Sequence, residues 1–364
     1  MSTRAVMMEI LDLARWAPSG DNTQPWRFEI VGESQVVVHG FDTRDHVVYD
    51  LDGRPSQISL GALLETMSIA SSIYGLSMSV QRRAGLPEQT PTFDVEFAIE
   101  PERFLDPLAA CITERCVQRR PMKTRALTAN EKQALEAAVE PDYKILWLEG
   151  FGSRLRAARL MFVNAKLRLT MPEAYRVHKE VIQWNCRFSE DRVPDQELGI
   201  DPLTARLMRF VLGSWRRVEF FNRFLAGTWL PRIQMDFLPG LACAAHVVIK
   251  AKTKPASTDD FVAAGRTVQR FWLTATKLGL FQQPEMTPLI FGSYVRNGIP
   301  FTAVAGLEDQ ARKLEIQTRS LLGEDLDHAV WMGRVGAGPS PVARSTRRPV
   351  EQLMHSPPKS HFAR

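Results

Sequence analysis

The chain carries one stretch from which its fold can be worked out, Ala17-Pro18-Ser19-Gly20-Asp21-Asn22-Thr23-Gln24-Pro25-Trp26. Before it, residues 5–16 place apolar side chains at helical spacing, and from residue 26 the chain alternates like a β-strand. A proline and a glycine inside the stretch end the helix. The resulting loop presents Asn22 and Gln24, whose amides both donate and accept hydrogen bonds. From the residues alone, it is either a ligand-binding loop or an ordinary helix stop with an Asx turn.

Composition narrows the class of protein. The 364 residues are 45% hydrophobic and 24% charged, which is typical of a globular protein with one large or two medium domains. No apolar run reaches the length of about 18 residues that a membrane helix needs, and the N-terminus lacks a signal-peptide pattern. The four cysteines show no C-x-x-C pair and no zinc spacing. We therefore expect a cytoplasmic protein with free thiols, no bound metal and no membrane contact.

The net charge is +5, and the excess basic residues gather in three clusters, at 115–125, 206–223 and 344–364. A basic surface can meet nucleic acid or anionic lipid. Because the clusters are separate and no nucleic-acid motif accompanies them, a phosphorylated cofactor is the favoured partner and nucleic acid is not expected.

The order of the predicted elements indicates an α+β chain built as two related halves. A helix, two paired strands, a long helix and a strand are followed by a larger variation on the same pattern. Expected elements are helices at 5–16, 58–74, 129–139, 153–170, 172–184 and 260–278, and strands at 26–31, 35–39, 92–99, 144–148 and 242–251. We place the first half at 1–105 and the second at 106–353, with an insertion at 185–240. Within it a helix starts at 201–202, with apolar positions up to 224. The chain after 334 is expected to be extended, and 354–364 to be a disordered basic tail.

Three further stretches could carry chemistry. Arg115 and Arg119 could grip a phosphate, or could belong to a solvated basic face. Residues 278–285 close the last long helix and could lay backbone groups beside a planar ring, or form an ordinary C-cap. Arg347 or Arg348 could add a second phosphate contact, or lie in a disordered tail.

Together and in this order, these stretches resemble the nitroreductase superfamily of flavoproteins. The A-P-S-x-x-N-T-Q-P-W-x-F string is the specific part, and the chain looks most similar to long Acg-type FMN-binding oxidoreductases and to ThiF-associated nitroreductase-like proteins. The resemblance covers 5–140 and 240–353, and covers the insertion poorly. Supporting strings are Asp52-Gly53-Arg54, Ile58-Ser59-Leu60-Gly61-Ala62, Ala264-Gly265-Arg266 with Gln269, and Arg334-Val335-Gly336-Ala337-Gly338-Pro339.

The resemblance implies a nitroreductase-like fold with FMN held between two halves, which are usually two subunits. It assigns Asn22 to the edge of the flavin ring, with Gln24 supporting the loop. Arg115 and Arg119 would hold the phosphate, Arg347 would hold it from the other side, and Pro284 and Glu285 would run beside the ring. The resemblance therefore implies seven cofactor-binding residues, Asn22, Gln24, Arg115, Arg119, Pro284, Glu285 and Arg347.

Two departures from the family change the expectation. Shorter members place the arginine motif before the asparagine loop, whereas here Arg115 follows Asn22. Two halves in tandem explain this order, so we predict a pseudo-dimer with one FMN site per chain. Val117 stands where the family often has serine or threonine, which would remove a hydrogen bond worth about 1 kcal/mol.

The implied reaction is ping-pong: NAD(P)H reduces FMN, which then passes electrons to a small-molecule acceptor. No catalytic side chain is predicted, since Tyr175, His178 and His246 are each more often structural, and His246 is expected in the core. Residues 185–240 are interpreted as a lid, with an extra core helix or a partner surface as alternatives. The basic amphipathic stretch 203–225 would also suit a membrane surface, but the lid is favoured.

Two other functions stay open at this point. The chain could sequester FMN with little turnover, or it could be a flavin-less interaction protein beside a ThiF-like adenylating partner. A homodimer is a further candidate assembly.

Overall fold

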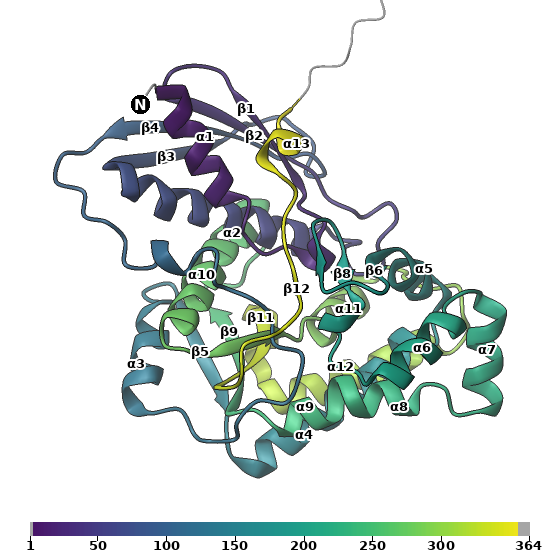
Figure 1. Ribbon diagram of the computed structural model, residues 1–364. Helices are drawn as coiled ribbons and strands as arrows, with labels where there is room; N and C mark the ends of the chain where they lie inside the picture. Colours follow the sequence, from purple (N-terminus) through teal and green to yellow (C-terminus); the bar gives the residue numbers. More distant parts are fainter. Residues whose placement is uncertain (1–2, 356–364) are drawn as a thin grey trace, which may run out of the picture.

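The computed structural model describes residues 3–355, and the first half of the chain forms an antiparallel sheet with two helices (Figure 1). Its elements are α1 (Thr3–Ala14), η1 (Gly20–Asn22), β1 (Trp26–Ile30), β2 (Gln35–Gly40), α2 (Arg54–Ser71), η2 (Ser72–Tyr74), β3 (Leu76–Arg82) and β4 (Thr92–Ile99). The strand order is β1-β2-β4-β3, with every neighbouring pair antiparallel. Alternating side chains such as Phe93, Val95 and Phe97 are buried, as the period of a strand requires.

The second half is built on another four-stranded antiparallel sheet. Its strands are β5 (Tyr143–Leu148), β9 (Ala245–Ala251), β10 (Phe281–Pro284) and β11 (Ala329–Gly336), in the order β10-β11-β9-β5. Every residue of β9 is buried, because both faces of this central strand are covered. Residues 281–284, which were expected to close the last long helix, thus form a paired strand.

Helices surround the second sheet. They are η3 (Ala109–Cys111), α3 (Ala129–Ala137), α4 (Gly150–Leu169), α5 (Pro172–Val181), α10 (Thr258–Lys277), α11 (Thr287–Asn297), α12 (Leu307–Leu322) and η6 (Glu324–His328). Thr128 is the N-cap of α3, where Thr128 and Glu131 form a reciprocal capping box. The helix predicted to reach residue 184 ends at Val181, where the chain turns into a short strand.

The insertion contains several short elements. They are β6 (Ile182–Gln183), β7 (Phe188–Ser189), β8 (Val193–Pro194), η4 (Asp195–Glu197), α6 (Pro202–Val211), α7 (Trp215–Phe224), α8 (Trp229–Arg232), the π-helical turn η5 (Ile233–Phe237) and α9 (Leu238–Leu241). The helix predicted to begin at 201–202 does not continue to 224. It ends at Val211, Gly213 follows, and Ser214 caps a new helix by accepting a hydrogen bond from the backbone N–H of Arg217. Glycine has a low helical propensity and serine is a favoured N-cap, so the break is local in origin.

The two halves meet where α2 crosses α10, and two glycines make the crossing possible. A Cβ on Gly61 would lie 1.9 Å from the carbonyl oxygen of Val262, and one on Gly265 would lie 2.0 Å from that of Ile58. Polar contacts flank the crossing, since Gln269 Nε2 donates to Thr66 Oγ1 at 2.9 Å. The supporting strings around Gly61 and Gly265 therefore encode a close helix crossing.

The end of the chain returns to the first half. After β12 (Arg344–Ser345), α13 (Val350–Leu353) buries Val350 and Leu353 in the core beside α1 and β1. The sequence places 106–353 in the second half and 354–364 in a disordered tail, but Met354 pairs with Phe28 and the His355 N–H donates to the Phe28 carbonyl at 2.6 Å. Residues 356–364 of the predicted tail lie outside the described residues.

Candidate functional site

The motif loop adopts an unusual backbone. Asp21, Asn22 and Gln24 have φ values of 51°, 62° and 51°, in the left-handed region that few residues other than glycine occupy. Asparagine and aspartate tolerate this region best. The Asn22 Nδ2 atom donates to the carbonyls of Arg192 and Thr346, each at 3.2 Å. The loop is therefore fastened both to the insertion and to the returning C-terminal segment.

Gln24 lies behind the loop, and its amide is fully engaged by the backbone. Its Nε2 donates to the carbonyls of Asn22 at 3.1 Å and Glu190 at 2.8 Å, while its Oε1 accepts from the Arg348 N–H at 3.0 Å. The side chain is completely buried and does not line the cavity described next. Gln24 supports the loop that carries Asn22.

A cavity of about 420 Å³ lies between the two halves. The first half contributes residues of the motif loop and of α2, and the second contributes residues of α10, β10 and β11. It brings together six of the seven residues that the sequence singled out. These are Asn22, Arg115, Arg119, Pro284, Glu285 and Arg347. The volume falls within the range of about 300–1,000 Å³ for small-molecule sites.

One end of this cavity is strongly basic. Arg115, Arg119, Arg344 and Arg347 all line it, against the single carboxylate of Glu197. Arg119 forms an ion pair with Glu197, whose other oxygen accepts from Ser345 Oγ at 2.8 Å. We call this group the arginine end.

Arg115 and Arg347 are held by groups that leave their charge uncompensated. Arg115 donates to the Trp16 carbonyl at 2.8 Å and stacks over the Trp272 ring at 4.7 Å, while Arg347 Nε donates to the Ala17 carbonyl at 3.0 Å. Burial, followed by the nearby charge of Arg344, lowers the pKa of Arg115 to about 10. Burial and the charges of Arg115 and Arg344 also lower the pKa of Arg347. Like charges held this close favour an anion between them.

The side wall contains Pro284 and Glu285, and the Glu285 carboxylate is already bound on both oxygens. Oε2 lies 2.6 Å from His246 Nδ1, and Oε1 accepts from Arg334 at 3.0 Å. His246 Nε2 faces the Gly240 carbonyl at 2.8 Å, so both ring nitrogens meet acceptors and the ring is held as an imidazolium. Burial alone would lower the pKa of His246, but Glu285 raises it to about 10. His246 lies in the core, as predicted, and Glu285 fixes the β10–α11 backbone.

The other end of the cavity carries a polar cluster that the sequence does not predict as a site. Its members are Asp21, Tyr49, Arg168, His178 and Asp236. Tyr49 Oη and His178 Nε2 are 2.8 Å apart, and Arg168 donates to Asp236 Oδ1 at 2.9 Å. Burial lowers the pKa of His178 to about 3 and raises that of Asp236 to about 6. We call this group the acidic end.

Asp21 differs from the other residues of the acidic end in its contacts. Within residues 3–355 its carboxylate has neither a hydrogen bond nor an ion pair, although it faces the cavity. Burial raises its pKa, while the charges of Arg119 and Arg168 act in the opposite direction. Asp236 lies in the π-helical turn η5, a rare element that is often found at functional sites. Burial therefore raises the pKa of two carboxyl groups at the acidic end.

The cavity contains features that fit a flavin nucleotide. The Asn22 Oδ1, Arg115 Nε, Gln283 Oε1 and Arg344 Nε atoms are buried without a partner in the described residues, and all four side chains line the cavity. Buried polar atoms of this kind normally have partners. The edge of a flavin ring would supply donors to the amide oxygens, and a phosphate would supply acceptors to the guanidinium nitrogens. Between the ends, Ile58, Trp272 and Trp331 provide an apolar wall for a planar ring.

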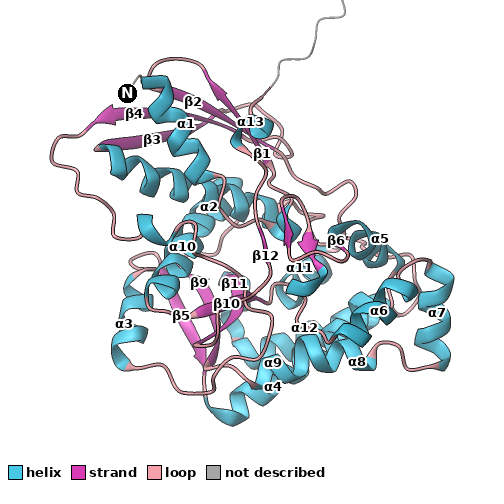
Figure 2. Cartoon of the chain, in the orientation of Figure 1, coloured by secondary structure: helices cyan, strands magenta, loops and turns pink. Residues whose placement is uncertain are grey.

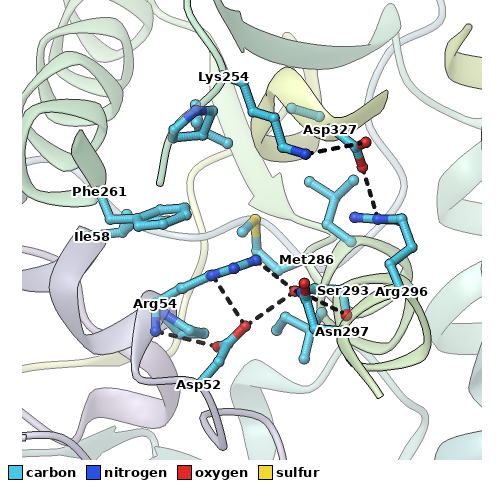
Figure 3. A pocket seen from close by; sticks show the side chains of 16 residues that line it. Asp52, Arg54, Ile58, Lys254, Phe261, Met286, Ser293, Arg296, Asn297 and Asp327 are labelled. Carbon is cyan, nitrogen blue, oxygen red and sulfur yellow. Dashed lines mark hydrogen bonds and ion pairs between the residues drawn. The ribbon is translucent and has the colours of Figure 1, made fainter. Parts of the chain in front are cut away.

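A smaller cavity of about 250 Å³ adjoins this one and shares Ile58, Met286 and Ile290 with it. Figure 3 shows its charged side chains turned toward one another. Arg54 pairs with Asp52 at 3.3 Å, and Arg296 pairs with Asp327 at 2.8 Å. Because these charges compensate each other, the smaller cavity lacks the unmatched charge of the arginine end.

Sequence reasoning missed several lining residues for identifiable reasons. Arg344 belongs to the same basic run as Arg347, so a signal was present. Asp21 lies inside the motif itself, at a position that the motif leaves open. His178 was expected to be structural, and nothing in the sequence links Arg168 with Asp236, because they meet only through the packing of α4 against η5.

A comparison with protein families found a match over the part of the chain that contains the motif loop. Residues 3–79 match the family model described as Nitroreductase family, so this segment is similar to that family. No curated protein matches the chain. The predicted α+β class is confirmed by the mixed sheets and helices of the fold.

Solved structures show only a remote similarity. A nitroreductase-like family protein from Bacillus cereus is 13% identical with a TM-score of 0.34, over 70% of this chain and 97% of that one. The FMN-dependent nitroreductase NfnB from Mycobacterium smegmatis, solved with NADPH, is 15% identical with a TM-score of 0.34, over 70% of this chain and 96% of that one. Similarity at this level gives no support for a shared activity.

Among residues 3–355, no helix is long and apolar enough to cross a membrane. The same residues contain no group of three or more His, Cys, Asp or Glu side chains arranged to hold a metal ion.

Proposed function

We propose that the chain binds FMN in the cavity between its halves and is an FMN-dependent oxidoreductase that uses NAD(P)H to reduce a small acceptor. The observation that carries the proposal is the arginine end, where four guanidiniums face one carboxylate in a cavity that begins at the motif loop. Bound FMN would supply two-electron transfer, and the protein would supply position and electrostatics.

Different residues of the cavity hold different parts of FMN in this proposal. Arg115, Arg344 and Arg347 hold the phosphate, while Arg119 takes part through its pair with Glu197. Asn22 presents its free Oδ1 to the edge of the ring. Pro284 and Glu285 offer backbone groups alongside the ring, because the Glu285 carboxylate is engaged elsewhere.

We place the acceptor at the acidic end, between the ring and the insertion. Reduction of most two-electron acceptors consumes protons, and Asp236, whose pKa burial raises to about 6, is the carboxyl group there that can hold one. The insertion closes this end with apolar side chains, including Met208, Leu212 and Met235. This supports its interpretation as a lid.

The pseudo-dimer is part of the proposal. Both halves contribute to one cavity, so a single chain would hold one complete FMN site, and a homodimer would not be needed to build it. The resemblance to long Acg-type oxidoreductases and to ThiF-associated proteins stays a prediction.

The decisive experiment is the absorption spectrum of the purified protein, before and after incubation with FMN. We expect a flavin band that survives gel filtration. A colourless protein that takes up no added FMN would overturn the proposal and favour a flavin-less interaction protein.

A sequestering role is the second candidate, because the lid residues enclose the cavity. Anaerobic stopped-flow reduction with NADH and NADPH distinguishes sequestration of FMN from oxidoreductase activity. Rapid bleaching of the flavin band supports the oxidoreductase, and a bound flavin that neither nucleotide reduces would support sequestration.

A further inference from the structure

Helices α6 and α7 expose an apolar surface on the outside of the insertion. We define the α6–α7 surface by five apolar residues and five arginines, namely Leu203, Leu207, Phe210, Phe220, Phe224, Arg206, Arg209, Arg216, Arg217 and Arg223. The apolar side chains are 43% to 75% exposed. Figure 2 shows α7 at the edge of the molecule, away from both four-stranded sheets.

The aromatic part of this surface is continuous. The rings of Phe210 and Phe221 lie 6.4 Å apart, those of Phe221 and Phe220 lie 6.1 Å apart, and those of Phe220 and Phe224 lie 5.2 Å apart. Arg217 sits over the Phe210 ring at 4.3 Å. A contiguous exposed aromatic patch of this kind usually marks an interaction site.

The exposed face is not needed to hold the helices in place. On their inner side, Thr204 and Val218 are buried, and Met208 reaches the cavity. Asn222 Nδ2 donates to the Leu169 carbonyl at 2.8 Å, and the Tyr175 hydroxyl donates to that of Leu212 at 3.2 Å. The sequence assigns this stretch to a lid, and of α6 and α7 only the inner side of α6 reaches the cavity.

The positive charge of the α6–α7 surface indicates the kind of partner that it binds. Glu219 is the only acidic residue in α6 and α7. Within residues 3–355, Arg206, Arg209 and Arg216 make neither an ion pair nor a side-chain hydrogen bond. A second copy of the chain docking face to face would bring two sets of five arginines together, which like-charge repulsion opposes.

We propose that the α6–α7 surface binds peripherally to an anionic lipid bilayer. Amphipathic helices that combine phenylalanine and leucine with arginine lie in the plane of the interface, with the apolar side chains at the acyl boundary. The arginines meet the lipid headgroups, and each basic residue near an anionic surface strengthens binding by about fivefold. This contact is independent of the flavin proposal.

The test is co-sedimentation of the purified full chain with vesicles of phosphatidylcholine alone or phosphatidylcholine mixed with phosphatidylglycerol. We expect binding to the mixed vesicles that weakens as salt is raised, and little binding to the neutral ones. A variant with Arg206→Gln, Arg209→Gln and Arg216→Gln should bind on the order of 100-fold more weakly. A variant with Phe220→Ser and Phe224→Ser should also lose binding, although its charge is unchanged.

The matched control carries Lys123→Gln, Lys277→Gln and Lys313→Gln, three exposed lysines on other elements. It loses the same charge and should bind mixed vesicles as the unaltered chain does. Equal loss in this control would show non-specific attraction by net charge and overturn the proposal. Absence of vesicle binding by the unaltered chain would overturn it in favour of an acidic protein partner. A concentration-dependent dimer dissolved by the phenylalanine substitutions would assign the surface to a second copy.

Discussion

Arg115 offers the sharpest test of the arginine end. In Arg115→Met, the new side chain keeps much of the packing against Trp272 but removes the positive charge. A charge-assisted hydrogen bond contributes about 1.5–3 kcal/mol. Losing one to the phosphate should raise the Kd for FMN by about 10- to 150-fold.

The stability of the flavin-free protein should respond differently. The substitution removes the hydrogen bond to the Trp16 carbonyl, worth about 1 kcal/mol. It also relieves the repulsion from Arg344, which together with burial lowers the pKa of Arg115, and removes a charge that lowers the pKa of Arg347. Because these effects oppose each other, we expect the free energy of unfolding to change by less than about 1.5 kcal/mol.

The assay compares FMN with riboflavin, which lacks the phosphate, by fluorescence titration of flavin-free protein. Arg115→Met should weaken FMN binding and leave riboflavin binding nearly unchanged. Arg120→Met is the control, because Arg120 belongs to the same run but is exposed and does not line the cavity. An equal loss for both flavins would show that Arg115 acts through the fold, and an unchanged Kd for FMN would place the phosphate elsewhere.

Three other predictions test the fold and the acidic end. Gly61→Ala should destabilise the chain by several kcal/mol, on the order of a severe overpacking defect, because its Cβ would collide with the Val262 carbonyl, whereas Gly152→Ala, which meets no atom within 4 Å, should be neutral in urea unfolding; equal midpoints would contradict the crossing. Glu285 raises the pKa of His246 from 6.5 to about 10, so its stabilisation is complete below pH 6.5 and is lost as pH rises through 10. His246→Gln should therefore cost about 3–5 kcal/mol at pH 6 and less at pH 10, and a cost that does not depend on pH would be inconsistent with a charged histidine. Asp236→Asn should slow acceptor reduction and flatten its pH profile near pH 6 while reduction of the flavin by NAD(P)H is unchanged, and an unaltered profile would remove Asp236 as a proton source.

Local sequence determined much of the chain. The asparagine and aspartate of the motif loop suit its left-handed backbone, Thr128 and Glu131 cap α3, and the alternation at 92–99 defines β4. These features depend on neighbours within a few residues, so their physical causes are readable in the sequence. The family resemblance added the pairing of the loop with the arginines, and the cavity contains both.

Tertiary structure decided what depends on contacts between distant segments. Arg168 meets Asp236, and Glu285 is neutralised by His246 and Arg334, only because separate elements pack together. In the folded chain, the insertion also has an inner side that lines the cavity and an outer side that faces solvent. The sequence by itself determined that the motif loop and the arginines exist; the packing of α2 on α10, which only glycines permit, decided that they share one cavity.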